Sequence, residues 1–310
     1  MDNPVVISVN ISVEKGTTKK PVSKGVVTAT GIEGDAHAGA WHRQVSLLAR
    51  ESIDQFSIQA GKTYQPGDFA ENLTTAGVNL ASVSLRDRFR IGTVVLEVTQ
   101  IGKECHGDGC AIFREVGKCV MPKEGIFARV LHGGEIHPSD ALQHESRPLK
   151  MVIITTSDRA SRGEYEDRSG PAIRERAERH FQGSEWSVVI QNRLIPDDAD
   201  RLKATLRQAL DEGADMIFTT GGTGIGPRDI TPDVVAPMLT RTIPGIMEAI
   251  RVKYGATIPS ALLSRGVAGL IGSTLVYTLP GSVKAVNEYM DEIGLTLNHS
   301  LLMLMGIDAH

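Results

Sequence analysis

The sequence predicts two domains in succession: a mainly β, barrel-like N-terminal domain and a C-terminal α/β domain with a doubly wound, mostly parallel sheet. Its 310 residues, 41% of them hydrophobic, are enough for two ordinary cores. Before Pro148 the chain consists of short alternating runs with frequent glycine, whereas after it strand-like and helix-like segments alternate. We therefore expect domains at residues 1–147 and 148–310.

Composition argues against several classes of protein. The formal net charge is −4, and neither half has the strongly basic character of a nucleic-acid binder. No apolar run is long enough to span a membrane, and the start MDNPVVISVN lacks the basic flank and apolar core of a signal peptide. All three cysteines lie between Cys105 and Cys119, which argues against a secreted disulfide framework. We expect a cytoplasmic protein with no nucleic-acid or membrane partner.

The elements of the N-terminal half are short and strand-like. They are the runs VVISVNISV, GVVTATGIEGD, RFRIGTVVLEVTQIG and GIFARVLHGG. One helix is expected between them, over residues 47–59. Strands at this spacing, separated by turn residues, are typical of a β barrel.

The elements of the C-terminal half alternate in type. The strands are expected in KMVIITTSD, WSVVIQNRLIP, ADMIFTT and STLVYTLPG, and the helices in GPAIRERAERHF, DDADRLKATLRQALDEG and SVKAVNEYMDEIG. In the second helix Leu202, Leu206 and Leu210 recur every fourth residue and Gly213 ends the pattern. Ser282 is placed to cap the third helix. This alternation predicts a parallel sheet with helices on both faces.

A glycine-rich loop, TTGGTGIGPRDITP over residues 219–232, follows the third of these strands. Ligands of open α/β sheets bind at the carboxyl ends of the strands. Glycines let backbone N–H groups approach an anion, and the hydroxyls of Thr220 and Thr223 can donate to phosphate oxygens. The loop lacks the Gly-Lys-Ser/Thr ending of a Walker loop and the spacing of a dinucleotide fingerprint. It is expected to bind a phosphate.

The end of the loop carries two opposite charges, Arg228 and Asp229, before Thr231-Pro232, where a helix is expected to begin. A carboxylate beside a bound phosphate is repulsive unless a cation lies between them. Mg²⁺ takes one or two carboxylates together with phosphate oxygens. We expect Asp229 to contact an Mg²⁺–nucleotide; the alternative is a glycine-rich turn in which Asp229 caps the helix.

Four motifs in this order resemble a known family. SDRASRGEYEDRSGP, IPDD at 195–198, the TTGGTG…RD-x-TP loop and LPGS at 279–282 are similar to Mog-type molybdopterin adenylyltransferases over residues 149–310. The resemblance implies transfer of AMP from Mg-ATP to the terminal phosphate of molybdopterin, with release of pyrophosphate. It also implies a homotrimer and a molybdenum-insertion enzyme that receives the product. Relatives with the same fold include domains that have lost this transfer or cleave other nucleotides.

The resemblance also implies site residues. Asp229 and Asp197 match the two functionally important acids, which we assign to catalysis and to Mg²⁺. The alternative for Asp197 is that it only caps the helix that follows it, which its residue type and position allow. Residues expected to bind nucleotide or pterin are Ser157, Asp158, Thr220, Gly221, Gly222, Thr223, Gly224, Arg228, Pro280, Gly281 and Ser282.

The cysteine window, IGKECHGDGCAIFREVGKCV, admits three interpretations. Lys103 and His106 could favour the thiolate of Cys105, which follows a strand-like run, and so create a reactive sulfur. Cys105, His106, Cys110 and Cys119 could instead bind zinc, although their spacing fits no standard zinc knuckle. Cys110 and Cys119 could also be buried residues without chemistry.

A second resemblance covers residues 5–146. GIEGDAHAG, RQVSLL, FAENLTTAGV and EGIFARVLHGGEIHPSD are similar to MOSC domains, and this implies a β-rich fold that binds molybdenum cofactor or handles sulfur. The family pattern places its cysteine at Cys105, which we assign to catalysis.

Other polar residues of this half have two interpretations each. Asp35 and His37 either orient a ligand or form a Gly-Asp turn with a surface histidine. Arg43 either grips a cofactor phosphate bidentately or makes a surface ion pair. Phe127 is assigned to packing, and Arg129 is a weak ligand candidate.

The two resemblances together predict a fused protein of molybdenum-cofactor synthesis. Its substrates would be ATP and molybdopterin, with Mg²⁺ as the metal. One alternative is a binding and delivery protein in which neither half turns over. The other is a sulfurtransferase whose C-terminal half only recruits substrate.

Overall fold

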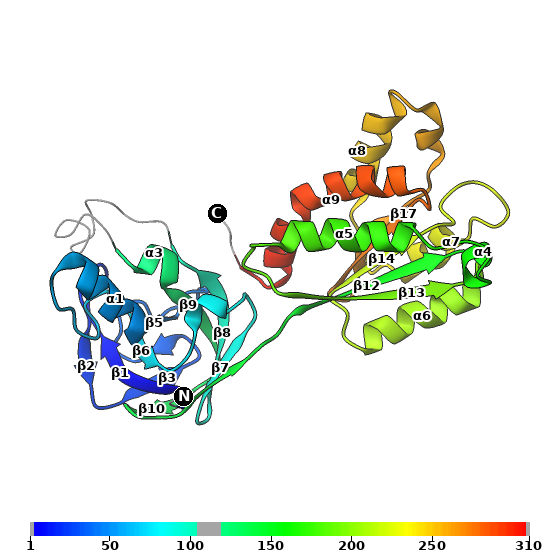
Figure 1. Ribbon diagram of the computed structural model, residues 1–310. Coiled ribbons are helices and arrows are strands. Elements are labelled where there is room, and N and C mark those ends of the chain that lie inside the picture. The colour runs from blue at the N-terminus through cyan, green and yellow to red at the C-terminus, as the bar shows by residue number, and fades with distance from the viewer. Residues whose placement is uncertain (1–2, 104–118, 308–310) are drawn as a thin grey trace. The chain divides into compact units, whose positions relative to one another are not determined.

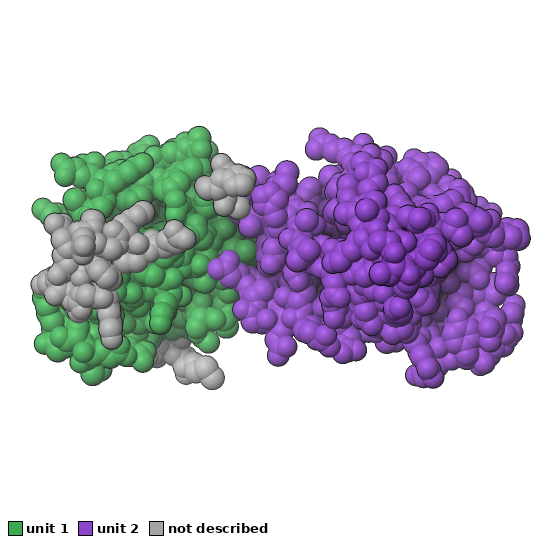
Figure 2. Space-filling model, turned by 90° about the horizontal axis from the view of Figure 1, so that it is seen from above, with its two compact units in different colours: residues 1–148 green, residues 149–310 purple. Residues whose placement is uncertain are grey.

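The computed structural model describes residues 3–103 and 119–307. The chain divides into two compact units, residues 1–148 and 149–310, which Figure 2 shows in separate colours. Each unit is described by itself. The predictions for Cys105, His106 and Cys110 lie outside the described residues.

The first unit is mainly β, as predicted. Within the described residues, one sheet has the strand order β11-β7-β8-β9-β5-β6-β1-β2 and a smaller sheet the order β10-β3-β4. The strands of the large sheet are β1 (Val5–Ile11), β2 (Lys20–Val22), β5 (Val45–Ala49), β6 (Leu73–Ala76), β7 (Arg88–Ile91), β8 (Val94–Ile101), β9 (Ile126–His132) and β11 (Leu142–Glu145). Those of the small sheet are β3 (Gly25–Thr28), β4 (Gly31–Ile32) and β10 (Gly134–Ile136).

The barrel-like fold predicted for this unit is not confirmed, because these strands form no closed barrel. The large sheet ends at β11 on one edge and at β2 on the other. Between β1 and the residues before β11 there is an isolated bridge, Val5 to Ala141, rather than a ladder. A barrel requires continuous pairing around the sheet, so the described architecture is an open sheet.

Among the described residues of this unit, the helices are α1 (Arg50–Ala60), α3 (Met121–Glu124) and the short 3₁₀ turn η1 (Leu80–Ser82). The helix predicted over 47–59 begins later, because Leu47 pairs with Ile126 of β9 and Leu73 of β6 and therefore belongs to β5. α1 ends at Gly61, whose φ of 65° is the left-handed conformation that glycine adopts easily. Phe127 lies in the core that α1 covers, which confirms its packing role.

The second unit is an α/β domain built on a six-stranded mixed sheet with the order β13-β12-β14-β17-β16-β15. The first four strands in this order are parallel, and β16 and β15 are antiparallel additions. The strands are β12 (Leu149–Thr156), β13 (Val188–Ile195), β14 (Met216–Thr220), β15 (Arg241–Thr242), β16 (Ala268–Ile271) and β17 (Thr274–Leu279).

Helices cover both faces of this sheet. Figure 1 shows α5 and α9 along one face and α6 along the other, with α4 and α7 near the carboxyl ends of the strands. The helices are α4 (Asp158–Ser161), α5 (Ser169–Phe181), α6 (Ala199–Asp211), α7 (Thr231–Val235), α8 (Pro244–Gly255) and α9 (Val283–Leu304), and the 3₁₀ turns are η3 (Ala236–Met238) and η4 (Pro259–Leu263). No helix in the described ranges is long and apolar enough to cross a membrane.

The sequence patterns explain these helices. Leu202 and Leu206 of α6 are fully buried against the sheet, and Leu210 is half-buried beside them. Ser282 caps α9 by accepting a hydrogen bond from the amide of Ala285 at 3.3 Å, as predicted. The amphipathic spacing of apolar residues therefore predicted α6, and the serine predicted the start of α9.

Candidate active site

The candidate site is a cavity of about 500 Å³ next to the ends of β14 and β17. One wall is the loop that follows β14, a second is the turn between β17 and α9, and the remaining wall comes from α8, η4 and α9. The sequence-predicted residues that line it are Gly221, Gly222, Thr223, Gly224, Asp229, Pro280, Gly281 and Ser282. Ser157, Asp158, Asp197, Thr220 and Arg228 are not among its lining residues.

The loop requires glycine for two physical reasons. Gly221 and Gly222 have φ values of 101° and 60°, a region that other residues rarely adopt. A Cβ on Gly221 would lie 2.4 Å from the carbonyl oxygen of Thr156, and one on Gly224 would lie 2.7 Å from Oδ2 of Asp229. The backbone here is packed so closely that no side chain fits.

Part of the loop backbone is already hydrogen-bonded to the protein. The amide of Gly221 donates to the carbonyl of Leu279 at 3.0 Å, continuing the pairing of β14 with β17. Thr231 donates to two loop carbonyls, from its hydroxyl to Gly221 at 2.9 Å and from its amide to Gly222 at 3.0 Å. The amides of Gly222, Thr223 and Gly224 donate to no acceptor among the residues that the structure describes. These three donors are left for a ligand.

Asp229 stands at the end of the loop, half-buried and on the cavity. Its Oδ2 accepts from the amide of Gly226 at 2.8 Å, and its own amide donates to the Gly226 carbonyl at 3.0 Å. The residue before α7 is Ile230, without a side-chain cap. The alternative that Asp229 caps this helix is therefore wrong. Its carboxylate closes a turn through one oxygen, and Oδ1 accepts from no donor in the described part of the chain.

Arg265 holds the loop in place, a role that the sequence did not indicate. Its Nε donates to the carbonyl of Gly224 at 2.7 Å, and its Nη2 donates to the carbonyl of Asp229. Its Nη1 donates to Asp233 at 2.7 Å, and its amide donates to the carbonyl of Thr223 at 2.9 Å. The hydrogen bond to Asp233 raises the pKa of the guanidinium further above its usual range. By contrast, Arg228 is exposed.

Thr220 does not serve as the predicted phosphate donor. It is fully buried, and its hydroxyl donates to the carbonyl of Pro280 at 2.9 Å. The Thr220 hydroxyl, which was expected to donate to a phosphate oxygen, instead connects the end of β14 to the turn between β17 and α9. Thr223, also buried, remains on the cavity.

A second acidic position lies at the ends of β12 and β13. The amide of Asp158 donates to Oδ2 of Asp197 at 3.1 Å, and the amide of Asp197 donates to Oδ1 of Asp158 at the same distance. Asp198, not Asp197, caps α6, by accepting from the amide of Arg201 at 2.7 Å. The alternative that Asp197 caps the helix is therefore wrong, because the capping residue is its neighbour Asp198.

Ser157 belongs to the same edge of the sheet and caps α4. Its hydroxyl oxygen accepts from the amide of Ala160 at 3.2 Å and lies 2.9 Å from the hydroxyl of Tyr165. Because β13, β12 and β14 are parallel, this edge and the glycine loop share the carboxyl ends of the strands. A ligand longer than the cavity would extend along that edge.

The opposite wall of the cavity presents aromatic rings and hydroxyls. The Tyr289 hydroxyl donates to Oγ of Ser264 at 2.9 Å, and burial raises the pKa of Tyr289. The amide of Gly266 also donates to Ser264 Oγ, at 3.4 Å. The Oγ atom of Ser264, which also lines the cavity, therefore accepts two hydrogen bonds. The hydroxyl of Tyr254 donates toward α9, and burial raises its pKa as well.

Within residues 3–103 and 119–307, no three or more His, Cys, Asp or Glu side chains are grouped so that they could hold a metal ion. The proposed zinc set of Cys105, His106, Cys110 and Cys119 falls largely outside these ranges. Cys119 itself is half-buried against the core of the first unit.

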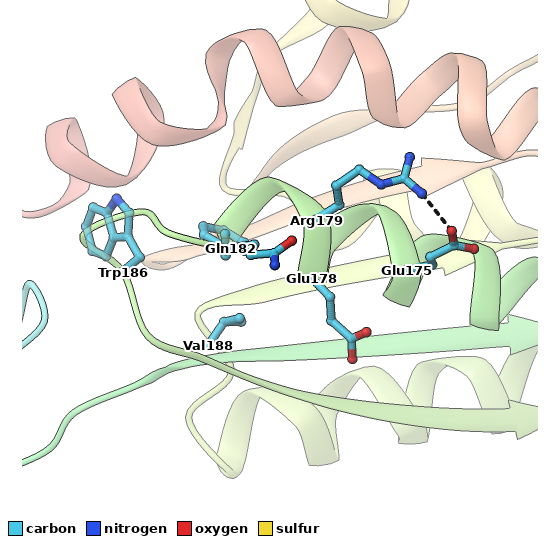
Figure 3. A pocket seen from close by; sticks show the side chains of 7 residues that line it. Glu175, Glu178, Arg179, Gln182, Trp186 and Val188 are labelled. Carbon is cyan, nitrogen blue, oxygen red and sulfur yellow. Dashed lines mark hydrogen bonds and ion pairs between the residues drawn. The ribbon is translucent and has the colours of Figure 1, made fainter. Parts of the chain in front are cut away.

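A second depression, of about 540 Å³, is formed by α5 and the segment before β13. Figure 3 shows that its charged side chains come from α5, with Trp186 on the segment that follows and Val188 at the start of β13. Glu175 and Arg179 form an ion pair at 2.7 Å, so part of the charge is compensated within the helix. It contains none of the residues predicted to act, and we assign it no chemistry.

Asp35 and His37 form the turn that one of their two interpretations expected, because Oδ1 of Asp35 accepts from the amide of His37 at 3.0 Å and the histidine is partly exposed. Asp35 is buried in an ion pair with Lys19, neither side chain being accessible. Burial alone would raise the pKa of Asp35, but hydrogen bonds from His37 and Lys19 outweigh it and hold this pKa far below its usual range. Arg129 donates to Glu97 at 2.6 Å, which leaves it a structural role.

Arg43 forms no ion pair with the residues that the structure describes. Its guanidinium carbon lies 4.8 Å from the ring centroid of Trp41.

Each of the two units matches a different known protein family. Residues 152–299 match the family described as "Probable molybdopterin binding domain", and residues 34–143 match "MOSC domain". The molybdopterin adenylyltransferase of Haemophilus influenzae is 36% identical over 47% of this chain and 73% of its own length. That of Pyrococcus furiosus is 34% identical over 54% and 96%. A solved structure of the molybdopterin biosynthesis enzyme MoaB from Thermus thermophilus is 40% identical, covering 51% and 97%, with a TM-score of 0.46.

Other relatives are longer proteins. The chain spans 21% of gephyrin from Dictyostelium discoideum and about half, 56% and 50%, of two molybdenum cofactor biosynthesis bifunctional proteins. The matched residues include the glycine loop, Asp229 and the turn before α9. Through its second unit the chain belongs to the molybdopterin adenylyltransferase family, and its first unit carries a MOSC domain.

Proposed function

We propose that residues 149–310 transfer the adenylyl group of ATP to the terminal phosphate of molybdopterin. An oxygen of that phosphate attacks the α-phosphorus of ATP, a new P–O bond forms, and the bond to pyrophosphate breaks. The observation that carries the proposal is the set of three unbonded amides, Gly222 to Gly224, on a cavity that Asp229 also lines. The named activity of the relatives agrees with it.

The loop residues act by positioning and by charge. Phosphoryl and nucleotidyl transfer depend mainly on in-line alignment and on stabilising charge that spreads over phosphate oxygens. Backbone N–H groups fixed by Arg265 and Thr231 need no reorganisation when that charge develops. The capped start of α9 at Ser282 supplies further amides with a favourable dipole for an anion. The aromatic wall with Tyr254 and Tyr289 suits a flat heterocycle.

Mg²⁺ fits the side chains present. Asp229 has one carboxylate oxygen committed to Gly226 and the other open, and Mg²⁺ is commonly bound through one or two carboxylates and substrate phosphates. We assign Asp229 as the principal ligand and Asp197 as the second. When bound, the ion neutralises phosphate charge and orients the transferring group. Ser157 and Asp158 belong to the same proposed site, at the strand edge next to the loop.

The test is a turnover assay with the purified chain, molybdopterin, Mg²⁺ and labelled ATP. We expect pyrophosphate release that is lost in Asp229→Asn and weakened in Asp197→Asn. Asp198→Asn is the matched control, because asparagine also caps helices and the release rate should not change. Stoichiometric retention of molybdopterin without pyrophosphate release would contradict the proposal and support a binding and delivery protein.

For the first unit we infer binding of molybdenum cofactor or carriage of sulfur. This rests on the MOSC match and, for Cys105, on the sequence alone. Persulfide on the chain that disappears in Cys105→Ser would support sulfur carriage by Cys105, persulfide that persists would assign it to another cysteine, and absence of persulfide would refute carriage. We also propose that the chain forms a homotrimer and passes its product to a molybdenum-insertion enzyme.

A further inference from the structure

Cationic side chains gather around the indole ring of Trp41, in the segment between β4 and β5. The guanidinium carbon of Arg43 lies 4.8 Å from the ring centroid, and the Lys15 ammonium lies 5.6 Å from it. The imidazole of His37 is stacked nearly parallel to the indole, with centroids 6.4 Å apart. The indole Nε1 donates to the carbonyl of His37 at 2.7 Å, which fixes the ring.

The donors of Arg43 have no acceptor among the residues that the structure describes. Its Nε is buried without a hydrogen-bond partner, and within the same residues no carboxylate pairs with Arg43 or with Lys15. A buried donor without an acceptor costs free energy, so the unbonded Nε of Arg43 favours a ligand group that the described residues do not supply. Stacking on an aromatic ring holds the guanidinium plane and leaves its edge for bidentate contact.

The neighbouring acid cannot neutralise these cations, because it is already engaged. Asp35 is buried in contact with Lys19 and also accepts from the amide of Ser12 at 3.0 Å. Lys19 lies 3.2 Å from Nδ1 of His37, so that nitrogen faces the buried pair. His37 is itself partly exposed, and its Nε2 is the ring nitrogen left for a ligand. Among the described residues, Arg43 and Lys15 therefore keep their charges without a paired carboxylate.

We propose that Arg43, Lys15 and His37 form a site for a tetrahedral oxyanion around Trp41. The chemistry suits a phosphate monoester or an inorganic oxyanion such as phosphate or molybdate, held by the guanidinium edge and the ammonium. The proposal deepens the binding role of the first unit and does not rest on the adenylyl transfer reaction.

The test uses the full chain with Trp186→Phe, which leaves Trp41 as the one tryptophan of the sequence. Inorganic phosphate, molybdate and glycerol 3-phosphate are titrated separately while Trp41 fluorescence is followed, with sodium chloride as the control at equal ionic strength. We expect a saturable change with the oxyanions and none with chloride. Tighter binding of glycerol 3-phosphate identifies an ester as the ligand, and tighter binding of molybdate identifies an inorganic ion.

Arg43→Lys keeps the positive charge and a long aliphatic side chain, but the ammonium cannot donate two parallel hydrogen bonds as the guanidinium does. We expect this variant to bind each oxyanion about tenfold more weakly. Arg90→Lys is the matched control, since Arg90 belongs to an exposed pair with Glu145 in the same unit and should leave the affinity unchanged.

Phosphorus NMR line broadening of glycerol 3-phosphate checks binding without the fluorophore. Equal affinity in Arg43→Lys, or a change that never saturates, would overturn the proposal. Repeating the titration in Asp229→Asn separates it from the transferase, because the Trp41 response should persist when pyrophosphate release is lost.

Discussion

The glycine loop and the Trp41 cluster offer anions two different kinds of donor. In the loop the donors are backbone amides at Gly222 to Gly224, held in place by hydrogen bonds from Thr231 and Arg265. At Trp41 they are side chains, Arg43 and Lys15, held against a ring. Backbone donors are rigid and carry no net charge, whereas side-chain cations carry charge and can be removed one at a time. The first arrangement suits a reaction and the second suits recognition.

The largest expected effect on the loop comes from adding one methyl group at Gly221. Gly221→Ala places a Cβ 2.4 Å from the Thr156 carbonyl at a φ of 101°, which is strained and overlapping. We expect loss of pyrophosphate release and destabilisation of the second unit by at least about 1–3 kcal/mol in denaturant unfolding. Gly272→Ala is the control, since its φ of 61° is also positive but nothing lies within 4 Å of the added atom. Equal losses in both variants would remove the close-approach argument.

Asp229→Asn tests whether the loop needs the negative charge of the Asp229 carboxylate. The amide oxygen of asparagine can still accept from Gly226, so the turn should persist while the negative charge is lost. We expect the rate of adenylyl transfer to fall about 10²–10³-fold, with an unfolding midpoint close to that of the parent. A large fall in the midpoint would show that the carboxylate is structural.

Arg265→Lys tests whether the loop must be held rigidly. Lysine keeps the charge but cannot donate at once to Gly224, Asp229 and Asp233, as the guanidinium does. We expect kcat to fall about tenfold with a smaller change in KM, because misplacement affects the transition state more than binding. Arg193→Lys, at the ion pair with Glu212, serves as the control. Unchanged kinetics in Arg265→Lys would show that the clamp is dispensable.

The smallest expected effect is a difference in salt sensitivity. Side-chain cations at an exposed site are screened by salt, whereas uncharged amides in a cavity are affected less. We expect added sodium chloride to weaken oxyanion binding at Trp41 more than it raises the KM for ATP. Parallel titrations in the two assays check this, and equal sensitivity would argue that both sites bind through net charge.

The sequence predicted the parts of this site that are local. Alternating strand and helix patterns indicated the parallel strands, the spacing of Leu202 and Leu206 indicated α6, and Ser282 indicated the start of α9. The glycines and Asp229 were chosen because they follow a strand end, and the structure places them on one cavity. These features depend on residues that are close in the sequence, so the spacing and type of residues are enough to predict them.

The features that were missed depend on distant residues. Arg265 contacts a loop residue 36 positions away, and no local pattern marks it. Thr220 was assigned to a phosphate because its partner, the carbonyl of Pro280, is 60 positions away. Leu47 was placed in a helix because its strand partners, Leu73 and Ile126, are also distant. Local patterns indicated Asp197 as a possible cap, and the cap is its neighbour Asp198.

The central claim is that free amides of the glycine loop hold the phosphate of the substrate. Nuclear magnetic resonance of the ¹⁵N-labelled chain, with and without Mg-ATP, tests it most directly. We predict that the amide signals of Gly222, Thr223 and Gly224 shift and exchange more slowly with solvent, while the exchange of Gly221, already bonded to Leu279, stays the same. Bound ATP with unchanged signals at those three amides would contradict the account.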